Sequence, residues 1–267
     1  MTSLTLTKHH GLGNDFVVAF QPGATDLSAL ARRLCDRRTG IGADGLLIAE
    51  SKEGYAAKMV LYNADGSRAE MSGNGIRCFA QALAMRSGDF DPQRISTDAG
   101  DRMVTLSMTD DPHTISARVE MGDVVPLSEP DGWSALGCHP DRPVAHLSLG
   151  NPHSVVGVDE IAVVDLADLG SKVPQVNLEI VEPGPELNGV TMRVHERGAG
   201  ITQACGTGAC AAAYASKQWG LVKADAAEVL VHMDGGTASV SFDLEHPSRA
   251  TLTGPATHVA TIEAPLT

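Results

Sequence analysis

The sequence lacks the patterns that mark exported, membrane-spanning or nucleic-acid-binding chains. Its five cysteines form no Cys-x-x-Cys pair and cannot all pair with one another, which indicates a reducing compartment. No apolar run approaches the roughly 18 residues of a membrane span, and residues 1–13 lack the segments of a signal peptide. The formal net charge of −13 and the lack of long Lys or Arg runs argue against a nucleic-acid surface. We therefore expect a cytoplasmic protein with no membrane or nucleic-acid partner.

The composition is that of a turn-rich globular protein. Hydrophobic residues make up 43% of the chain and charged residues 20%, with 28 Gly and 14 Pro, and low-complexity segments are absent. The 267 residues are more than one average core requires. Two halves of about 130 residues fit this length.

A short segment occurs twice in the chain. Residues 72–80, Ser-Gly-Asn-Gly-Ile-Arg-Cys-Phe-Ala, align without a gap with residues 205–213, Cys-Gly-Thr-Gly-Ala-Cys-Ala-Ala-Ala. Upstream of each copy, Leu-Gly-Asn precedes Val-Val, once from residue 12 and once from residue 149. The repeat is thus about half a chain long, and it favours two similar halves over a single irregular α+β domain.

Helical patterns follow both copies of the repeated turn. From Ile76 the apolar residues recur at helical spacing until Gly88, which predicts an amphipathic helix. The Ala-rich run 209–219 predicts a more deeply buried helix, and residues 27–37 predict a third on the surface of the first half.

Most of the remaining chain alternates like β-strands bounded by turn residues. The predicted strands span residues 16–20, 46–49, 58–63, 103–108, 115–121, 145–149, 154–158, 175–181, 190–194, 229–233, 238–242 and 250–253. We therefore predict an α+β fold of two pseudo-symmetric domains, each a mostly antiparallel sheet wrapped around a central helix. The first comprises residues 1–120, to which residues 257–267 return, and the second residues 121–256.

Each repeated turn places a reactive side chain at a helix start. Such a start offers unpaired N–H groups and a partial positive charge, so the glycines let a carboxylate approach closely. The same field lowers the pKa of a cysteine there, which favours a thiolate at Cys205 with Gly206 and Thr207 beside the anion. Ser72, with Gly73 and Asn74, occupies the matching position.

Two such turns around one anion suit proton transfer across the α-carbon of an amino acid. The carbanion beside a carboxylate is strongly unfavourable, and N–H donors on the developing enediolate would stabilise it. The glycine turns do not contain a phosphate-loop motif, and no Schiff-base lysine is evident. We expect the active site in a cleft between the halves, with no metal and no cofactor.

Several long segments together resemble the diaminopimelate epimerase family. They are His10-Gly-Leu-Gly-Asn-Asp-Phe16, Asn63-Ala-Asp-Gly-Ser67, residues 72–80, Gly150-Asn-Pro-His153, Glu196-Arg-Gly-Ala-Gly200 and Ala204-Cys-Gly-Thr-Gly208. The resemblance spans residues 8–215 approximately. It implies a homodimeric, pyridoxal-phosphate-independent isomerase that interconverts LL- and meso-2,6-diaminopimelate in lysine and peptidoglycan-precursor synthesis, with two opposed cysteines as bases.

The resemblance also assigns roles to individual residues. It implies that Cys205 and Ser72 are the catalytic pair, and that His153 and Glu196 modulate the pKa values of the catalytic groups. The residues implied in substrate binding are Asn14, Asn63, Gly73, Asn74, Asn151, Asn177, Glu196, Arg197, Gly206 and Thr207. A carboxylate and a guanidinium suit the ammonium and carboxylate at the far end of such a substrate.

Ser72 departs from the family pattern, in which a cysteine stands at this position. A hydroxyl is a far weaker acid than a thiol, so Ser72 is a poor unaided base, although it could still donate or relay a proton. Four interpretations stay open: an engineered inactive mutant, a natural Ser/Cys epimerase, a proline- or hydroxyproline-type racemase or dehydratase, and an amino-acid-binding homologue. A cysteine hydrolase would instead need His153 or His195 as the base for Cys205.

Overall fold

The computed structural model of the chain describes residues 3–24 and 26–265. The chain divides into two compact units: unit 1 is Met1–Val119 with Gly254–Thr267, and unit 2 is Glu120–Thr253. The assignment of residues 1–120 with 257–267, and of residues 121–256, to two domains stays a prediction. Within the described ranges, no helix is long and apolar enough to cross a membrane.

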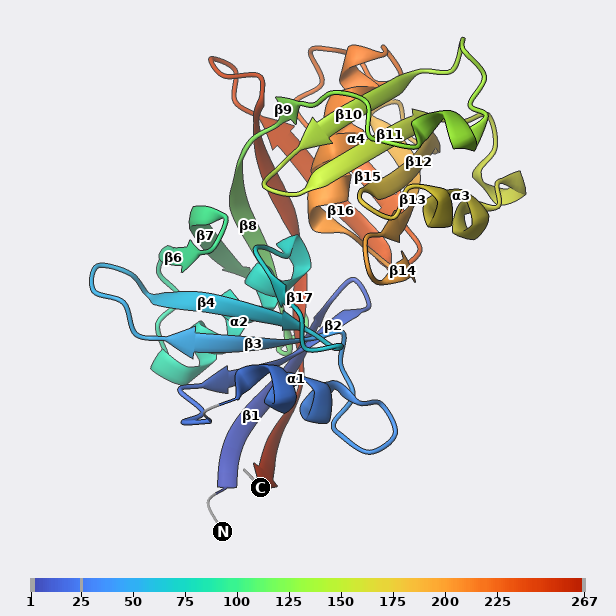
Figure 1. Ribbon diagram of the computed structural model, residues 1–267. Coiled ribbons are helices and arrows are strands. Elements are labelled where there is room, and N and C mark those ends of the chain that lie inside the picture. Colours follow the sequence, from blue (N-terminus) through green and yellow to red (C-terminus); the bar gives the residue numbers. More distant parts are fainter. Residues whose placement is uncertain (1–2, 25, 266–267) are drawn as a thin grey trace. The chain divides into compact units, whose positions relative to one another are not determined.

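Unit 1 is a closed ring of strands around a helix (Figure 1). Its strands are β1 (Ser3–Gly11), β2 (Asn14–Phe20), β3 (Gly45–Glu50), β4 (Ala57–Asn63), β5 (Arg68–Ala69), β6 (Gln93–Thr97), β7 (Gly100–Met108), β8 (Thr114–Asp123) and the later part of β17 (Arg249–Pro265). The hydrogen-bonded order is β17–β1–β2–β3–β4–β6–β7–β8, and β8 pairs with β17 to close the ring. The β2–β3 and β4–β6 pairs are parallel.

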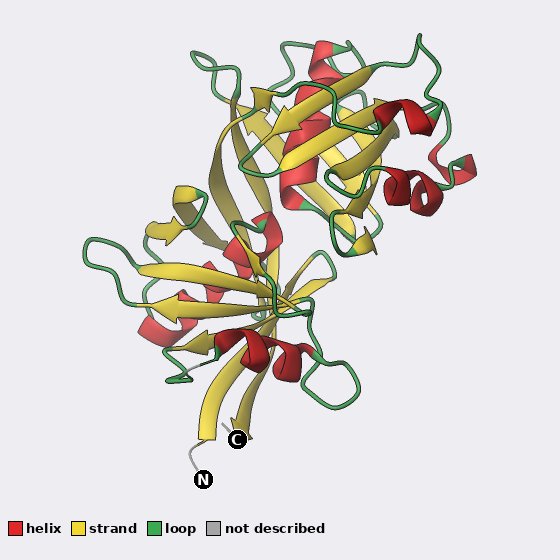
Figure 2. Cartoon of the chain, in the orientation of Figure 1, coloured by secondary structure: helices red, strands yellow, loops and turns green. Residues whose placement is uncertain are grey.

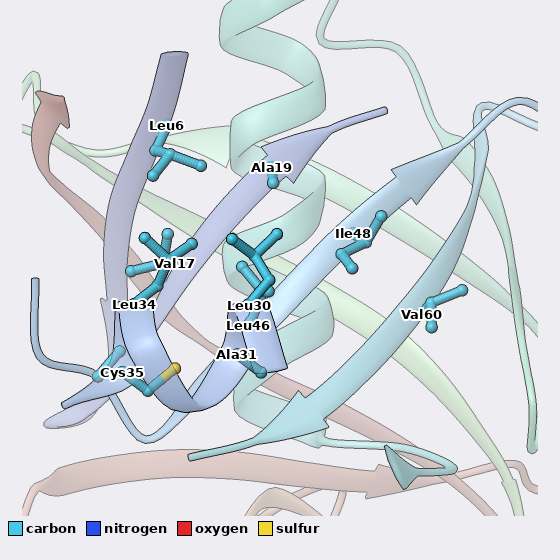
Figure 3. Close-up of a cluster of buried hydrophobic side chains, with 11 residues drawn as sticks. Leu6, Val17, Ala19, Leu30, Ala31, Leu34, Cys35, Leu46, Ile48 and Val60 are labelled. Atoms are coloured by element: carbon cyan, nitrogen blue, oxygen red, sulfur yellow. The ribbon is translucent and has the colours of Figure 1, made fainter. Parts of the chain in front are cut away.

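Two helices lie on opposite sides of this sheet. Helix α2 (Gly73–Ser87) packs against β1, β2 and β7 and is buried over most of its length, so it forms the centre of the unit. Helix α1 (Leu27–Cys35) starts at Asp26, whose side chain accepts from the N–H of Ala29, and covers the outside. Figure 3 shows its apolar stripe, including Leu30 and Leu34, on side chains of β1 to β4. Each such buried leucine stabilises the fold by roughly 1.5–3 kcal/mol.

Unit 2 repeats the arrangement with its own elements. Its strands are β9 (Val125–Pro126), β10 (Val144–Ser148), β11 (Pro152–Gly157), β12 (Asn177–Pro183), β13 (Gly189–Glu196), β14 (Gly200–Thr202), β15 (Val229–Met233), β16 (Gly236–Phe242) and the first part of β17. The helices are η1 (Trp133–Leu136), η2 (Ile161–Val163), α3 (Leu166–Lys172) and α4 (Gly206–Gln218). The pairing order is β9–β10–β11–β12–β13–β15–β16–β17, with β11–β12 and β13–β15 parallel.

The central helix of unit 2 is α4, which contacts β10, β11, β12, β13, β15 and β16. Figure 2 shows it among the strands of its unit. The alanines 209, 211, 212, 213 and 215 are all fully buried. Small side chains on every face of α4 let strands approach it from all sides, as expected for a helix that is apolar all round.

The two units therefore share one topology. Strands β1 to β4 correspond to β10 to β13, α2 to α4, and β6 and β7 to β15 and β16, with parallel pairs at the same places. The predicted α+β fold, a sheet around a central helix in each half, is confirmed. The sequence interpretation missed β1, β6, the short strands β5, β9 and β14, helix α3 and the later part of β17. In β1 a register shift between Lys8 and His9 interrupts the alternation by which a strand is recognised.

Candidate active site

In unit 1, Ser72 caps the start of α2. Its backbone is extended, and its Oγ accepts a hydrogen bond from the N–H of Gly75 at 3.0 Å. A Cβ added at Gly75 would lie 3.0 Å from Ser72 Cβ and 3.4 Å from the ring of Phe16. The second glycine of this turn therefore leaves room for the capping side chain.

Asn74, next in the turn, is held by side chains on both sides. Its Nδ2 donates to Asn14 Oδ1 at 3.2 Å, and Asn14 Nδ2 donates to Asp44 Oδ2 at 2.7 Å. The fully buried Arg77 donates to Asn74 Oδ1 at 2.7 Å and to the Gly73 carbonyl at 3.1 Å. The first turn of α2 is thereby fixed from within unit 1.

In unit 2, Cys205 caps α4 in the same way. Its backbone is extended, its Sγ accepts from the N–H of Gly208 at 3.4 Å, and Thr207 Oγ1 lies 3.5 Å from Sγ. A Cβ added at Gly208 would lie 3.3 Å from Sγ and 2.7 Å from Glu179 Oε1. The turn is therefore closely packed between the thiol above it and a carboxylate beneath it.

The electrostatics at Cys205 differ from the sequence-based expectation. Cys205 is only 5% exposed, and burial raises the pKa of its thiol well above the ordinary value. The carboxylates of Glu196 and Glu179 raise this pKa further, and the hydrogen bonds from Thr207 and Gly208 lower it only in part. The expectation of a lowered pKa was wrong, because loss of solvation and two nearby carboxylates outweigh the partial charge of one helix start.

Beneath α4 lies a buried polar pair. His153 Nδ1 and Glu179 Oε1 are 2.6 Å apart, and both side chains are fully buried. His153 Nε2 lies 3.1 Å from Asn151 Oδ1, and Asn151 Nδ2 donates to Thr207 Oγ1 at 3.2 Å. By strand register, His153 and Glu179 correspond to Phe16 and Leu47 of unit 1, so only unit 2 carries this pair.

The remaining predicted binding residues lie at strand ends. Asn177 opens β12, and its Oδ1 accepts from the backbone N–H of Arg197 at 2.8 Å. Glu196 closes β13 and accepts from Thr202 Oγ1 at 2.5 Å. In unit 1, Asn63 closes β4, and its Nδ2 donates to Ser67 Oγ at 3.0 Å. Asn63 and Glu196 occupy equivalent positions in the two units.

The predicted residues divide between the two units. Unit 1 holds Asn14, Asn63, Ser72, Gly73 and Asn74; unit 2 holds Asn151, His153, Asn177, Glu196, Arg197, Cys205, Gly206 and Thr207. The sequence interpretation missed Glu179, Asp44 and Arg77. Glu179 had a visible signal, because it is a charged residue inside the apolar run Leu178 to Val181.

The geometry of the described residues does not favour a cysteine hydrolase. His153 directs its two ring nitrogens to Glu179 and Asn151, and the ring of His195 packs against Gly170 of α3. Within the described part of the chain, neither histidine is hydrogen-bonded to Cys205, which a hydrolase would need to activate its thiol.

Solved structures share this two-unit α+β fold over the full chain. A phenazine biosynthesis protein of the PhzF family from Bacillus anthracis matches with a TM-score of 0.79 at 15% identity, covering 100% of both chains. A hydroxyproline epimerase from Agrobacterium vitis matches with a TM-score of 0.70 at 14% identity, covering 99% of this chain and 91% of the other. At such identities these likenesses show the fold alone.

Sequence relatives define the family. The profile of the family described as diaminopimelate epimerase matches residues 6–127 and 146–259. The diaminopimelate epimerase of Desulforapulum autotrophicum is 36% identical, covering 97% of this chain and 98% of its own, and that of Burkholderia vietnamiensis is 38% identical, covering 96% of each. The chain belongs to the diaminopimelate epimerase family, and the class of enzyme that this membership indicates is an isomerase.

Proposed function

We propose that this chain interconverts LL- and meso-2,6-diaminopimelate by moving a proton across the α-carbon without pyridoxal phosphate, as a step toward lysine and peptidoglycan precursors. The observation that carries the proposal is the pair of topologically equivalent helix starts, each capped by a side chain that can carry a proton. We further propose that the active molecule is a cytoplasmic homodimer, on the ground of the family alone.

Substrate binding in this mechanism uses both helix starts. The backbone N–H groups at the start of α2 and α4 would hold the α-carboxylate and stabilise the enediolate that forms when the α-proton leaves. Glu196 and Arg197 would hold the ammonium and carboxylate at the distal end, with Asn63 and Asn177 beside them. The mechanism requires the two helix starts to reach the α-carbon from opposite faces.

Cys205 is the proposed acid/base group on one face. Its raised pKa makes the thiol its resting form, which suits proton donation to the carbanion. In the reverse direction the thiol must first lose its proton, and the positive α-ammonium of a bound substrate would favour the thiolate. Thr207 and Gly208, both within hydrogen-bond reach of Sγ, would stabilise that charge.

Ser72 is the proposed group on the other face, and it limits the rate. Its Oγ accepts an N–H from Gly75, as Cys205 Sγ does from Gly208, so the geometry is retained while the acidity is not. Each unit of pKa costs about 1.36 kcal/mol in forming the base. The unmodified chain should therefore exchange the α-proton from the Cys205 face faster than it inverts the centre.

The test compares the unmodified chain with Ser72→Cys. General acid/base groups contribute roughly 10²–10⁴-fold, so Ser72→Cys should raise the rate of LL-to-meso conversion by about that factor. Optical rotation follows inversion, and mass spectrometry follows deuterium uptake from solvent at the α-carbon. If the unmodified chain already inverts as fast as Ser72→Cys, a hydroxyl suffices and the two-thiol mechanism does not apply here.

The same assay separates the other functions that Ser72 leaves open. Proline and hydroxyproline, supplied in place of diaminopimelate, would show racemisation or loss of water if the chain were of that type. An amino-acid-binding homologue would bind diaminopimelate but exchange no α-proton. Deuterium uptake with diaminopimelate, and none with the cyclic amino acids, is the expected result.

A further inference from the structure

Glu179 is a buried acidic residue that has no role in the mechanism proposed above. It lies in the middle of β12 between Leu178 and Ile180, and its side chain is fully buried. Among the residues that the structure describes, no hydrogen-bond partner reaches its Oε2. Burying a carboxylate costs several kcal/mol unless it is paired, and unit 1 has Leu47 at the equivalent position. The fold alone therefore does not require an acid here.

A continuous path of polar contacts joins Glu179 to the catalytic sulfur, entirely within unit 2. Glu179 Oε1 contacts His153 Nδ1 at 2.6 Å, and His153 Nε2 contacts Asn151 Oδ1 at 3.1 Å. Asn151 Nδ2 contacts Thr207 Oγ1 at 3.2 Å, and Thr207 Oγ1 lies 3.5 Å from Cys205 Sγ. In unit 1, Asn74 contacts Asn14, and Asn14 donates to Asp44; the position equivalent to Glu179 is Leu47.

The direction of each hydrogen bond follows from the orientation of the Asn151 amide. Its Nδ2 can only donate, so Thr207 Oγ1 accepts from it and keeps its own hydrogen for Cys205 Sγ. Its Oδ1 can only accept, so His153 Nε2 must carry a hydrogen. A donor on Sγ stabilises the thiolate, and this orientation of Asn151 is the one that provides it.

Glu179 controls which orientation is stable. His153 carries the Nε2 hydrogen when it shares one further proton with Glu179, either as an imidazolium beside a carboxylate or as an imidazole that accepts from a carboxyl. Both forms of the pair are neutral overall. Loss of that proton would leave a net negative charge in the core, and Nε2 would then be a hydrogen-bond acceptor. The Asn151 amide could flip, so that its Nδ2 donates to Nε2 and its Oδ1 accepts the Thr207 hydrogen that otherwise points to Sγ.

We propose that Glu179 is a positioning residue for proton transfer at Cys205: with His153 it holds the Asn151 amide so that the Thr207 hydroxyl donates to the sulfur. The proposal rests on the proposed function in one respect, the role of Cys205 as acid/base group. Burial raises the pKa of Glu179, with His153 opposing it, and this agrees with a pair that retains its proton.

Two substitutions separate positioning from simple anchoring. In Glu179→Gln the amide oxygen accepts from Nδ1–H without a buried charge. Nε2 then carries no hydrogen, and the Asn151 amide can flip. In Glu179→Leu nothing accepts from Nδ1, so the hydrogen stays on Nε2 and the orientation is kept. We expect Glu179→Gln to lower kcat about tenfold, as for a lost hydrogen bond to a charged group, with KM nearly unchanged. Glu179→Leu should lower kcat by a smaller factor.

A double-mutant cycle with Thr207 tests whether the effect passes through the hydroxyl. Thr207→Val removes the donor, and in this background neither Glu179 substitution should lower kcat further. Thr207→Ser keeps the hydroxyl and should preserve the difference between Gln and Leu. Leu47→Met changes a buried side chain at the equivalent position of unit 1 and is the control; it should leave kcat unchanged.

The opposite order overturns the proposal: if Glu179→Leu loses more activity than Glu179→Gln, Glu179 is only a hydrogen-bond anchor. Additive losses in the Thr207→Val background overturn it as well. The iodoacetamide reaction rate of Cys205, read by mass spectrometry without substrate, gives the same cycle independently of turnover. Thiol reactivity that follows the cycle in a chain inactive on diaminopimelate would support the role of Glu179 while refuting the proposed function.

Discussion

Protonation of His9 should destabilise unit 1 as the pH falls. His9 lies in β1, is fully buried, and places Nδ1 2.8 Å from Gln81 Oε1. Because that oxygen accepts, Nδ1 carries the hydrogen, and within the described residues Nε2 has no hydrogen-bond partner. Protonation would place a charge and an unsatisfied N–H in the core. Burial lowers the pKa of His9 from 6.5 to about 4. The Gln81 hydrogen bond opposes this decrease, and the nearby His258 and His10 add to it.

The size of the effect follows from proton linkage. The unfolded chain binds the proton near pH 6.5 and the folded chain only near pH 4. The free energy of unfolding is therefore unaffected by His9 above pH 6.5 and decreases as the pH falls from 6.5 to 4. For this one group the loss is about 2 kcal/mol near pH 5 and about 3 kcal/mol near pH 4. Below the folded pKa the loss levels off.

The assay is urea unfolding at a series of pH values for the unmodified chain and for His9→Leu. Other groups titrate in both chains, so the measured quantity is the difference between their free energies of unfolding. We expect His9→Leu to be less stable near neutrality, where it lacks the Gln81 hydrogen bond, and to gain on the unmodified chain as the pH falls. A difference that does not change with pH would refute the burial argument for His9.

Two further predictions concern the site. In Gly208→Ala the new Cβ would lie 2.7 Å from Glu179 Oε1, an atom held by its histidine partner, so we expect about 1–3 kcal/mol of destabilisation by urea unfolding and a clear loss of epimerase activity. Gly75→Ala, whose nearest contact is 3.0 Å, is the matched control and should lose less in both measurements. In iodoacetamide labelling without substrate, Cys138 should react first because the other four cysteines are buried, and the rate at Cys205 should still rise with pH at alkaline values. Faster labelling of Cys205 at neutral pH would contradict its raised pKa.

The repeated glycine turns were sufficient to predict much of the fold. The spacing of apolar residues after Ser72 and Cys205 predicted both central helices, because helix formation depends on residues close in sequence. The repeated segment at Asn14 and Asn151 predicted two halves of one kind, because each copy carries the same local pattern. Strand β1 was missed since its bulge is set by its partner β17, which lies at the other end of the chain.

The electrostatics of the site could not be predicted in the same way. The sequence places Cys205 at a helix start but does not show how deeply it is buried or that Glu179, in strand β12, lies close enough to raise its pKa. The Glu179–His153 contact joins residues 26 positions apart through the parallel pairing of β11 and β12. Such contacts depend on the register of the sheet, which a single sequence leaves open.

Ser72→Cys would not make the two faces of the site equivalent, because the units share one topology but carry different side chains at equivalent positions. At the positions where unit 2 has His153 and Glu179, unit 1 has Phe16 and Leu47, so a thiol at position 72 would have no acidic residue at the position equivalent to Glu179. The two thiols would have different solvation and different partners, so removal of the proton from either face would pass over barriers of different height. Solvent isotope effects measured from the LL and the meso isomer should then be unequal. Proton removal would be faster at the Cys205 face only if the Thr207 hydrogen bond stabilises the thiolate by more than the repulsion from the Glu179 carboxylate destabilises it.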